Sequence, residues 1–225
     1  MVSVWAVLAA AGRGERLGSD RPKAFARLGD RPLLAESLER LEDSDWIDAI
    51  VVAAPPEWEE PAILLAEELG AGKVGSVVTG GASRSESVRL ALAEVADDAA
   101  VVLVHDAARP FVPEDVIERL LAPLGEGWDG VVPGLPVTDT VKRVEGDRVV
   151  ETLPRAELVA VQTPQVFVAS VLREALGGDV SGAGDCASLV EARGGRVKVV
   201  VGDRRLLKVT SAEDLALVET WLAGP

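Results

Sequence analysis

Cysteine and histidine are nearly missing from this chain of 225 residues, which contains one of each. The single cysteine, Cys186, excludes an intramolecular disulfide framework and fits the reducing cytoplasm, and we expect it to be a small core residue. The single histidine, His105, argues against a multi-histidine zinc site and a Ser-His-Asp triad. We therefore expect His105 to have a structural role.

Long hydrophobic runs are missing as well. The first apolar stretch, Val4–Ala11, is too short to span a membrane, and no cationic segment precedes it as in a signal peptide. No other segment approaches the length needed to span a membrane. We therefore expect a cytoplasmic protein that makes no contact with a membrane.

Positive charge is scarce and unevenly placed. Lys and Arg number 23 against 37 Asp and Glu, and the net charge of −14 argues against general binding of nucleic acids. Residues 1–31 are the exception, with six basic side chains against three acidic ones. A cationic segment on an acidic protein favours a small anionic ligand over a polymer.

The first 23 residues join a predicted strand to a glycine-rich loop. Val4–Ala11 is apolar throughout, as is typical of a strand buried on both faces of a parallel sheet. Gly12, Gly14 and Gly18 follow, with basic residues at Arg13, Arg16, Arg21 and Lys23. Exposed amides in such a loop can surround an anion, so we predict a phosphate cradle at the carboxyl edge of the sheet.

The common nucleotide motifs do not fit this loop. A dinucleotide fingerprint would need its third glycine one residue before Gly18, and a nucleotide-triphosphatase loop would need Lys-Ser/Thr where Ser19-Asp20 stand. A glycine-rich turn with solvated arginines remains the simpler interpretation of the loop taken alone.

Strand and helix patterns alternate along most of the chain. The predicted strands are Val4–Ala11, Ala49–Ala53, Val74–Thr79, Val101–Val104, Gly130–Pro133 and Val197–Val201. The predicted helices are Leu33–Leu41, Pro61–Leu69, Ser83–Val95, Glu114–Leu121, Ala169–Leu176, Cys186–Ala192 and Ala212–Leu222. This order indicates a three-layer α/β fold with a mostly parallel sheet. We expect residues 1–225 to form a single domain, because neither linker nor repeat is visible.

The alternation breaks between residues 136 and 161. Thr140–Val144 and Arg148–Thr152 flank Glu145-Gly146-Asp147, which is a hairpin signal. A hairpin of two strands is only marginally stable unless it packs on something. We therefore expect 136–161 to form an arm that clasps a second subunit, and the alternative is a hairpin folded back on its own domain.

Chemistry-bearing residues gather just after the predicted strands, in the segments Gly12–Lys23, Gly80–Ser87 and Asp106–Arg109, and at Lys208. Ligands of open α/β sheets bind at this edge. Asp106 ends an apolar strand, where a carboxylate needs a cation, a donor or a metal. A plain salt bridge between Asp106 and Arg109 is the alternative.

Motifs with a family resemblance occur in order over nearly the whole chain. They are Ala10-Ala11-Gly12-x-Gly14-x-Arg16, Pro22-Lys23, Gly80-Gly81-x-x-Arg84-x-x-Ser87-Val88, His105-Asp106-Ala107-Ala108-Arg109-Pro110, Asp139-Thr140-Val141-Lys142, Thr163-Pro164-Gln165 and Lys208-Val209-Thr210-x-x-Glu213-Asp214-Leu215. The ordered set resembles the 2-C-methyl-D-erythritol 4-phosphate cytidylyltransferases of the non-mevalonate isoprenoid pathway.

The resemblance implies a Rossmann-like nucleotidyltransferase fold and a homodimer joined by the hairpin arm. The implied reaction transfers CMP from CTP to 2-C-methyl-D-erythritol 4-phosphate, giving 4-diphosphocytidyl-2-C-methyl-D-erythritol and pyrophosphate. Mg²⁺ would be carried mainly on the triphosphate, with Asp106 as its protein ligand. The phosphate oxygen of the acceptor would attack the α-phosphorus in line, with no covalent enzyme intermediate.

The resemblance also implies roles for individual residues. The catalytic cations would be Arg16, Lys23, Arg155 and Lys208. The nucleotide would be bound by Ala10, Ala11, Gly12, Gly14, Gly81, Ser87 and Asp106. The polyol phosphate would be bound by Asp106, Ala107, Thr140, Arg155, Thr163 and Asp185. Arg155 would come from the arm of the partner subunit.

One motif departs from the family pattern. Gly184-Asp185-Cys186 stands where relatives commonly carry Thr-Asp-Asp/Glu, which removes a hydroxyl and a carboxylate. The chain could therefore be a sister cytidylyltransferase that acts on ribitol 5-phosphate or another polyol phosphate.

Other functions are less consistent with the motifs. Gly80-Gly81 and Ser87 argue against a guanylyl- or uridylyltransferase. Arg16, Lys23 and Lys208 argue against a non-catalytic nucleotide-binding regulator, which would be expected to lack a catalytic cation. A nicotinamide oxidoreductase is disfavoured by the glycine spacing.

Overall fold

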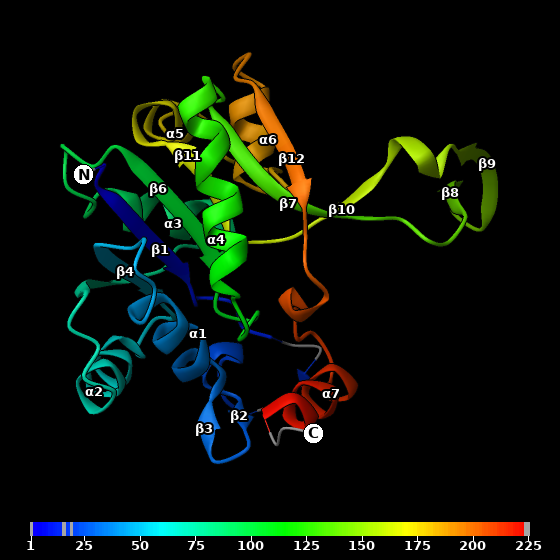
Figure 1. The fold of residues 1–225 in the computed structure, drawn as a ribbon. Helices are drawn as coiled ribbons and strands as arrows, with labels where there is room; N and C mark the ends of the chain where they lie inside the picture. The colour runs from blue at the N-terminus through cyan, green and yellow to red at the C-terminus, as the bar shows by residue number, and fades with distance from the viewer. Residues whose placement is uncertain (1, 15–16, 19, 223–225) are drawn as a thin grey trace.

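The computed structural model of the chain describes residues 2–14, 17–18 and 20–222. Its described residues form a central sheet of eight strands in the order β10-β7-β11-β6-β1-β4-β5, with β12 beside β7 (Figure 1). The strands are β1 (Val4–Ala9), β4 (Ala49–Ala54), β5 (Val74–Thr79), β6 (Val101–Asp106), β7 (Gly130–Pro136), β10 (Val159–Val161), β11 (Gln165–Val168) and β12 (Val197–Val201).

The heart of the sheet is parallel, as predicted. β1 lies between β6 and β4, and β5 follows β4, all running in one direction. β12 is parallel to β7, whereas β11 is antiparallel to both β6 and β7. Strands β10 and β11 were not predicted from the sequence. β11 therefore makes this a mixed sheet with a parallel core.

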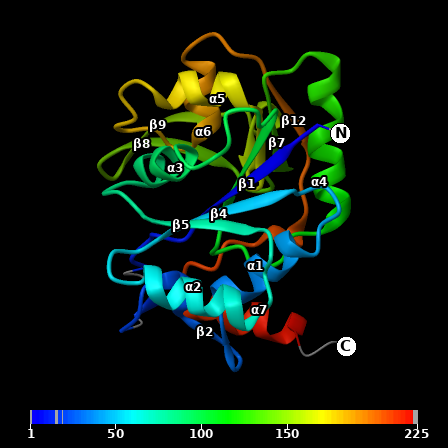
Figure 2. The ribbon, with the colours of Figure 1, turned by 90° about the vertical axis from the view of Figure 1, so that its left-hand side faces the viewer.

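Helices cover both faces of the sheet. They are α1 (Leu33–Glu42), α2 (Glu59–Glu68), α3 (Arg84–Leu92), α4 (Glu114–Leu121), α5 (Ala169–Leu176), α6 (Cys186–Glu191) and α7 (Ala212–Leu222). Buried side chains of α1, α2 and α4 pack on one face, and those of α3, α5 and α6 on the other (Figure 2). Each face of the sheet has its own hydrophobic core, and successive residues of β1 point into the two cores alternately. Leu8 lies in the core beneath α1, α2 and α4, and Val7 lies in the core beneath α3, α5 and α6. The predicted three-layer α/β fold is confirmed.

The predicted helices are all present, with small shifts at their ends. Ser83 caps α3, since its hydroxyl accepts a hydrogen bond from the amide of Glu86 at 3.1 Å. The carboxylate of Glu86 accepts from the amide of Ala82 at 2.9 Å, one residue earlier than in a capping box. The start of α3 is therefore fixed just beyond Gly80-Gly81.

The hairpin of β8 (Val141–Glu145) and β9 (Arg148–Leu153) pairs only with itself among the described residues. It stands away from the rest of the chain (Figure 1). The two ends of the expected arm, Pro136 and Val159–Val161, are paired with each other in the main sheet. The part that leaves the sheet is therefore 137–158, shorter than the expected 136–161.

A small unit of two strands and one helix lies at the carboxyl edge of the sheet. Strands β2 (Arg27–Leu28) and β3 (Arg31–Pro32) pair with each other, and Val218 of α7 packs in one cluster with Leu28 of β2 and Leu33, the first residue of α1. None of the helices in the described part of the chain is long and apolar enough to cross a lipid bilayer.

Candidate active site

The segments that follow the parallel strands meet at one edge of the sheet. Ala9 and Asp106 are paired in register, and the amide of Ala107 donates to the carbonyl of Ala9 at 3.0 Å. On the other side, the amide of Ala10 donates to the carbonyl of Ala53 at 2.9 Å. The amide of Gly80 donates to Ala54 at 2.7 Å. The glycine loop therefore begins between Asp106 and the Gly80-Gly81 turn.

Two glycines let the loop fold closely on its neighbours. Gly14 has a φ of +69°, and a Cβ placed on it would lie 2.5 Å from the Cβ of Lys23. A Cβ on Gly80 would lie 2.2 Å from the Cβ of Ala11. The amide of Lys23 also donates to the carbonyl of Gly12 at 3.3 Å. Lys23 thus lies against the loop, while the expected catalytic cation Arg16 falls outside the described residues.

Ser87 fixes the shape of the Gly80-Gly81 turn. Its hydroxyl accepts from the amide of Gly81 at 3.0 Å and donates to the carbonyl of Ser83 at 2.8 Å. Ser87 is buried, with 2% of its surface exposed. A Cβ on Gly81 would lie 2.3 Å from Cγ of Glu86. The Gly80-Gly81 turn is therefore held tightly against the start of α3.

Asp106 is held between two cations. Its Oδ1 accepts from Nε of Arg84 at 2.7 Å, and its Oδ2 accepts from Nζ of Lys208 at 2.6 Å. Burial by itself would raise the pKa of this carboxyl, but Arg84 and Lys208 hold the pKa well below its usual range. Asp106 is therefore ionised, and the alternative of a salt bridge to Arg109 is wrong. The guanidinium of Arg109 donates instead to the carbonyl of Leu206.

His105 belongs to a buried chain of hydrogen bonds behind Asp106. Nε2 of His105 lies 2.9 Å from the carbonyl of Arg109, so Nε2 carries the proton. Nδ1 then accepts from the hydroxyl of Thr163 at 3.1 Å, which itself accepts from the amide of Asp106 at 3.1 Å. This chain confirms the structural role of His105. It also places Thr163 directly beside Asp106.

The burial of His105 predicts a loss of stability in acid. Its side chain is 0% exposed, and this burial lowers the pKa to about 4, from 6.5. The unfolded chain takes up a proton below about pH 6.5 while the folded one stays neutral, so stability falls as the pH is lowered from 6.5 towards 4. By about pH 4.5 the loss reaches about 2–3 kcal/mol.

Urea unfolding at pH 7 and at about pH 4.5 measures this loss. The His105→Gln variant is the matched control, because its amide can donate to Arg109 and cannot titrate in this range. We expect the pH dependence of the variant to be shallower by about 2–3 kcal/mol. Equal pH dependence of the two proteins would mean that His105 is not buried in its neutral form.

A cavity of about 300 Å³ opens beside Asp106. It is lined by Arg84, Asp106, Arg109, Val161, Gln162, Thr163, Gln165, Gly184, Asp185 and Lys208. Three of these residues carry buried polar atoms that lack a hydrogen-bond partner among the described residues: Nη2 of Arg84, Nε of Arg109 and Oε1 of Gln165. Such atoms are costly unless a ligand or water satisfies them. The wall therefore suits a ligand rich in hydroxyl or anionic oxygens.

The segment that departs from the family pattern forms one side of this cavity. Asp185 caps α6, with Oδ1 accepting from the amide of Ser188 at 2.9 Å. Its Oδ2 accepts from Nε2 of Gln165 at 2.7 Å. Cys186 is fully buried, its Sγ lies 3.7 Å from Nη1 of Arg84, and burial raises the pKa of its thiol. Cys186 is thus a core residue, as expected, and it also supports Arg84.

The expected residues of the arm lie away from this cavity within the same chain. Thr140 and Arg155 are both exposed, and neither lines the cavity. The guanidinium of Arg155 donates to the carbonyl of Thr138, at the base of the arm. A single chain therefore brings together Asp106, Thr163, Asp185 and Lys208 but leaves Thr140 and Arg155 outside.

Arg84 and Gln165 were not recognised as site residues from the sequence. Arg84 makes an ion pair with Asp106, and Gln165 holds Asp185. Both residues belong to motifs that carry the family resemblance, Gly80-Gly81-x-x-Arg84 and Thr163-Pro164-Gln165. Membership of these motifs is the signal that could have identified them.

In the described ranges, no group of three or more His, Cys, Asp or Glu side chains lies close enough to hold a metal ion.

Comparison with known proteins agrees with the motifs. The model of the 2-C-methyl-D-erythritol 4-phosphate cytidylyltransferase family matches residues 4–224. The cytidylyltransferase of that name from Saccharopolyspora erythraea is 47% identical, over 99% of this chain and 100% of that protein. The one from Frankia casuarinae is 47% identical, over 98% of this chain and 81% of that protein.

Solved structures agree as well. The crystal structure of 2-C-methyl-D-erythritol 4-phosphate cytidylyltransferase from Thermus thermophilus is similar with a TM-score of 0.77 and 35% identity, covering 97% of this chain and 98% of that one. A crystal structure of a 4-diphosphocytidyl-2C-methyl-D-erythritol synthase has a TM-score of 0.82 and 31% identity, covering 99% of each chain.

Proposed function

The chain belongs to the 2-C-methyl-D-erythritol 4-phosphate cytidylyltransferase family of the non-mevalonate isoprenoid pathway and is an enzyme of that activity, and we propose that its substrates meet beside Asp106. The observation that carries this proposal is the Arg84–Asp106–Lys208 cluster, which lines a polar cavity next to the glycine loop. The loop supplies a cradle for a triphosphate, and the cavity supplies donors for a polyol phosphate.

CTP binds along the glycine loop in this proposal. The amide of Ala10 is used within the sheet, where it donates to Ala53, so the loop amides that follow it up to Gly14 hold the triphosphate, as amides of open glycine loops hold anions elsewhere. The turn at Gly81, shaped by Ser87, recognises the cytosine edge, and Asp106 lies near the ribose. The Ser87 hydroxyl is occupied by the turn, so recognition of the base uses the backbone that Ser87 positions.

The polyol phosphate occupies the cavity beside Asp106. Asp106, Thr163 and Asp185 hold its hydroxyl groups, and Lys208 pairs with its phosphate. Ala107, which the family resemblance also implied, does not line the cavity, and its amide already donates to Ala9. Thr140 and Arg155 of the partner subunit complete the pocket. The cation of Lys208 is already fixed by Asp106, so it needs little reorganisation when the phosphate arrives.

Catalysis then consists of positioning and charge neutralisation. A phosphate oxygen of the polyol attacks the α-phosphorus of CTP in line, a new P–O bond forms, and the bond to pyrophosphate breaks. Negative charge grows on the nonbridging oxygens, where Arg16 and Lys23 stabilise it. No side chain needs to form a covalent bond with the substrate.

Magnesium fits this donor set when it is carried on the triphosphate. Mg²⁺ keeps several waters and typically takes one or two protein carboxylates besides phosphate oxygens. Asp106 is the carboxylate that the proposed site offers, and its oxygens also accept from Arg84 and Lys208. The ion would neutralise charge on the phosphates.

The buried and unpaired Cys186 supports a reducing compartment, the cytoplasm.

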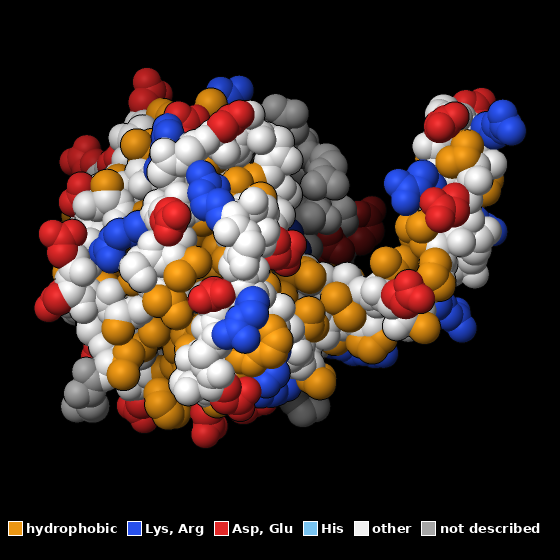
Figure 3. Space-filling view, turned by 90° about the horizontal axis from the view of Figure 1, so that it is seen from above, with side chains coloured by type: hydrophobic (Ala, Val, Ile, Leu, Met, Phe, Trp, Pro, Cys, Tyr) orange, Lys and Arg blue, Asp and Glu red, His pale blue; other side chains and the backbone are white. Residues whose placement is uncertain are grey.

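Exposed valines support a homodimer through the arm. Val144 and Val149 of the arm are 55% and 53% exposed, and Val199 and Val201 at its base are 47% and 68% exposed. Figure 3 shows hydrophobic side chains along the arm, which stands clear of the rest of the molecule. An isolated hairpin with an apolar surface needs a partner to pack on. A second copy of the arm is the partner we propose.

Pyrophosphate release tests the substrate assignment. CTP, UTP, GTP and ATP are each offered with Mg²⁺ and either 2-C-methyl-D-erythritol 4-phosphate or ribitol 5-phosphate. We expect release only from CTP with 2-C-methyl-D-erythritol 4-phosphate. Faster release with ribitol 5-phosphate would keep the mechanism and overturn the acceptor, with Gly184 and Cys186 as the residues to change next. No release despite CTP binding would overturn the assignment as a whole.

A further inference from the structure

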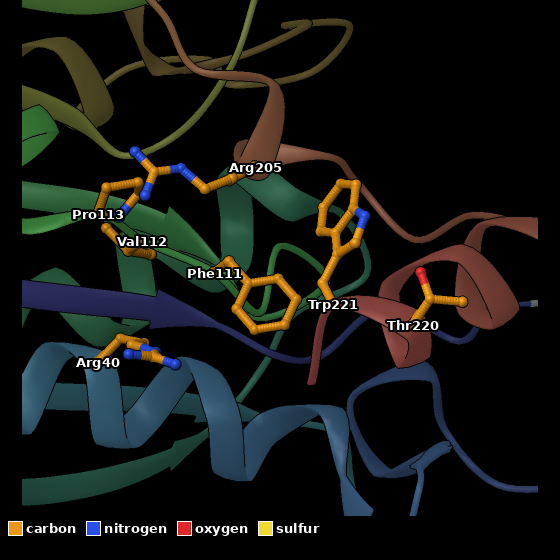
Figure 4. Close-up of a pocket in the computed structure, with 7 residues that line it drawn as sticks. All are labelled: Arg40, Phe111, Val112, Pro113, Arg205, Thr220 and Trp221. Atoms are coloured by element: carbon orange, nitrogen blue, oxygen red, sulfur yellow. The ribbon is translucent and has the colours of Figure 1, made fainter. Parts of the chain in front are cut away.

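A second cavity lies outside the proposed active site. It has a volume of about 590 Å³ and is lined by Arg40, Phe111, Val112, Pro113, Arg205, Thr220 and Trp221 (Figure 4). This volume falls within the usual range of small-molecule sites, about 300–1,000 Å³. None of these residues lines the cavity beside Asp106. It is therefore a separate pocket that the proposed reaction does not use.

Aromatic rings form the apolar part of this pocket. Phe111 and Trp221 approach each other with ring centroids 5.8 Å apart and an angle of 47° between their planes. Trp221 is 37% exposed, although a large aromatic side chain gains most from burial. Val112 lines the same pocket and is buried, with 4% of its surface exposed. A flat apolar ligand would cover the exposed part of these rings.

Arg40 supplies a cation to the same pocket. Its guanidinium carbon lies 5.8 Å from the centre of the Phe111 ring, and it makes no hydrogen bond or ion pair with the residues that the structure describes. Arg205, on the opposite wall, is already paired with Asp203 at 2.7 Å and approaches Asp115 at 3.8 Å. Arg40 is therefore the lining residue whose positive charge is not neutralised by a carboxylate of the described chain.

We propose that this pocket binds a small aromatic anion, with its ring against Phe111 and Trp221 and its phosphate or carboxylate paired with Arg40. A guanidinium matches the geometry of both anions and can also stack on an aromatic face. Neither half of such a ligand suffices alone. The ring without charge leaves the guanidinium of Arg40 without an anion, and the anion without a ring leaves the aromatic wall exposed.

The pocket is joined to the active site through two segments of chain. Phe111 and Val112 follow Asp106 in the same segment, and Arg205 precedes Lys208 by three residues. These segments are tied together, because the amide of Val209 donates to the carbonyl of Ala108 at 2.8 Å. An occupant of the pocket would therefore rest against both segments that carry the Asp106–Lys208 pair.

Calorimetric titration with 1-naphthyl phosphate tests the proposal, with saturating CTP present to fill the nucleotide site. We expect one binding site per chain with a Kd below about 1 mM. Neutral 1-naphthalenemethanol and inorganic phosphate should each bind at least about tenfold more weakly. Absence of saturable binding, or equal binding of the neutral compound, would overturn the proposal.

Variants locate the site. Arg40→Gln and Trp221→Ala should each weaken binding by about tenfold or more, while turnover with CTP stays at the wild-type level. Arg193→Gln, at an exposed arginine that does not line the pocket, should bind as the wild type does. Arg40 is exposed, so its replacement is not expected to disturb folding. Unchanged affinity in Arg40→Gln would place the ligand elsewhere and refute the assignment.

Discussion

Replacing Lys23 by Ala is expected to lower turnover by about 100- to 1,000-fold while leaving the fold intact. A preorganised cation or donor at the developing charge is worth about 3–4 kcal/mol in the transition state. Lys23 suits this role because its backbone is fixed against the glycine loop, at Gly12 and Gly14. Steady-state kinetics with both substrates varied will show whether kcat falls more than the KM values rise.

Lys73→Ala is the matched control for this loss. It removes the same charge at the opposite edge of the sheet, just before β5, where Nζ of Lys73 donates to the carbonyl of Ser44 at 2.7 Å. We expect the control to cost some stability and little turnover. Near-normal turnover in the Lys23→Ala protein would remove Lys23 from the catalytic groups. An equal fall in both variants would point to a general loss of folded protein.

The parallel core could be predicted from sequence because its strands are short, continuous and apolar. Val4, Ala6 and Leu8 face one core while Val7 faces the other, so every position in β1 had to be apolar. β11 was missed for a physical reason. β11 starts at Gln165, directly after Pro164. It is held in the sheet by antiparallel pairing with β6 and β7, which are distant in sequence. No local pattern encodes such a pairing.

The candidate site was predicted as a set of segments rather than as a set of contacts. The rule that ligands bind beyond the carboxyl ends of parallel strands predicted that the segments of Gly12, Gly80 and Asp106 meet at one edge of the sheet. The structure has these segments side by side there. The rule could not choose the partner of Asp106. Arg109 is nearer in the sequence, but the helical start of α3 and the segment after β12 bring Arg84 and Lys208 to the carboxylate instead.

Arg155→Ala is expected to raise the KM for 2-C-methyl-D-erythritol 4-phosphate by about 10- to 100-fold, with a smaller effect on the KM for CTP. The reason is the loss of a charge-assisted hydrogen bond to the phosphate, worth about 1.5–3 kcal/mol. Arg143→Ala is the matched control on the same arm, because Nε of Arg143 is already paired with Glu151 at 2.7 Å. The control should keep a wild-type KM.

A mixed dimer decides which subunit's site Arg155 serves. Within one chain Arg155 does not line the cavity beside Asp106, which is why we assign it to the partner's site. Chains carrying Lys23→Ala and Arg155→Ala are co-expressed with different tags, and the heterodimer is purified through both.

The two assignments of Arg155 predict different activities for this heterodimer. If Arg155 acts across the interface, one site has lost both residues and the other has lost neither, so the heterodimer should recover about half of the wild-type turnover. If Arg155 acts in its own subunit, one site lacks Lys23 and the other keeps the raised KM, so no recovery follows when the polyol phosphate is held near the wild-type KM. Failure to isolate any heterodimer would contradict the arm-mediated dimer itself.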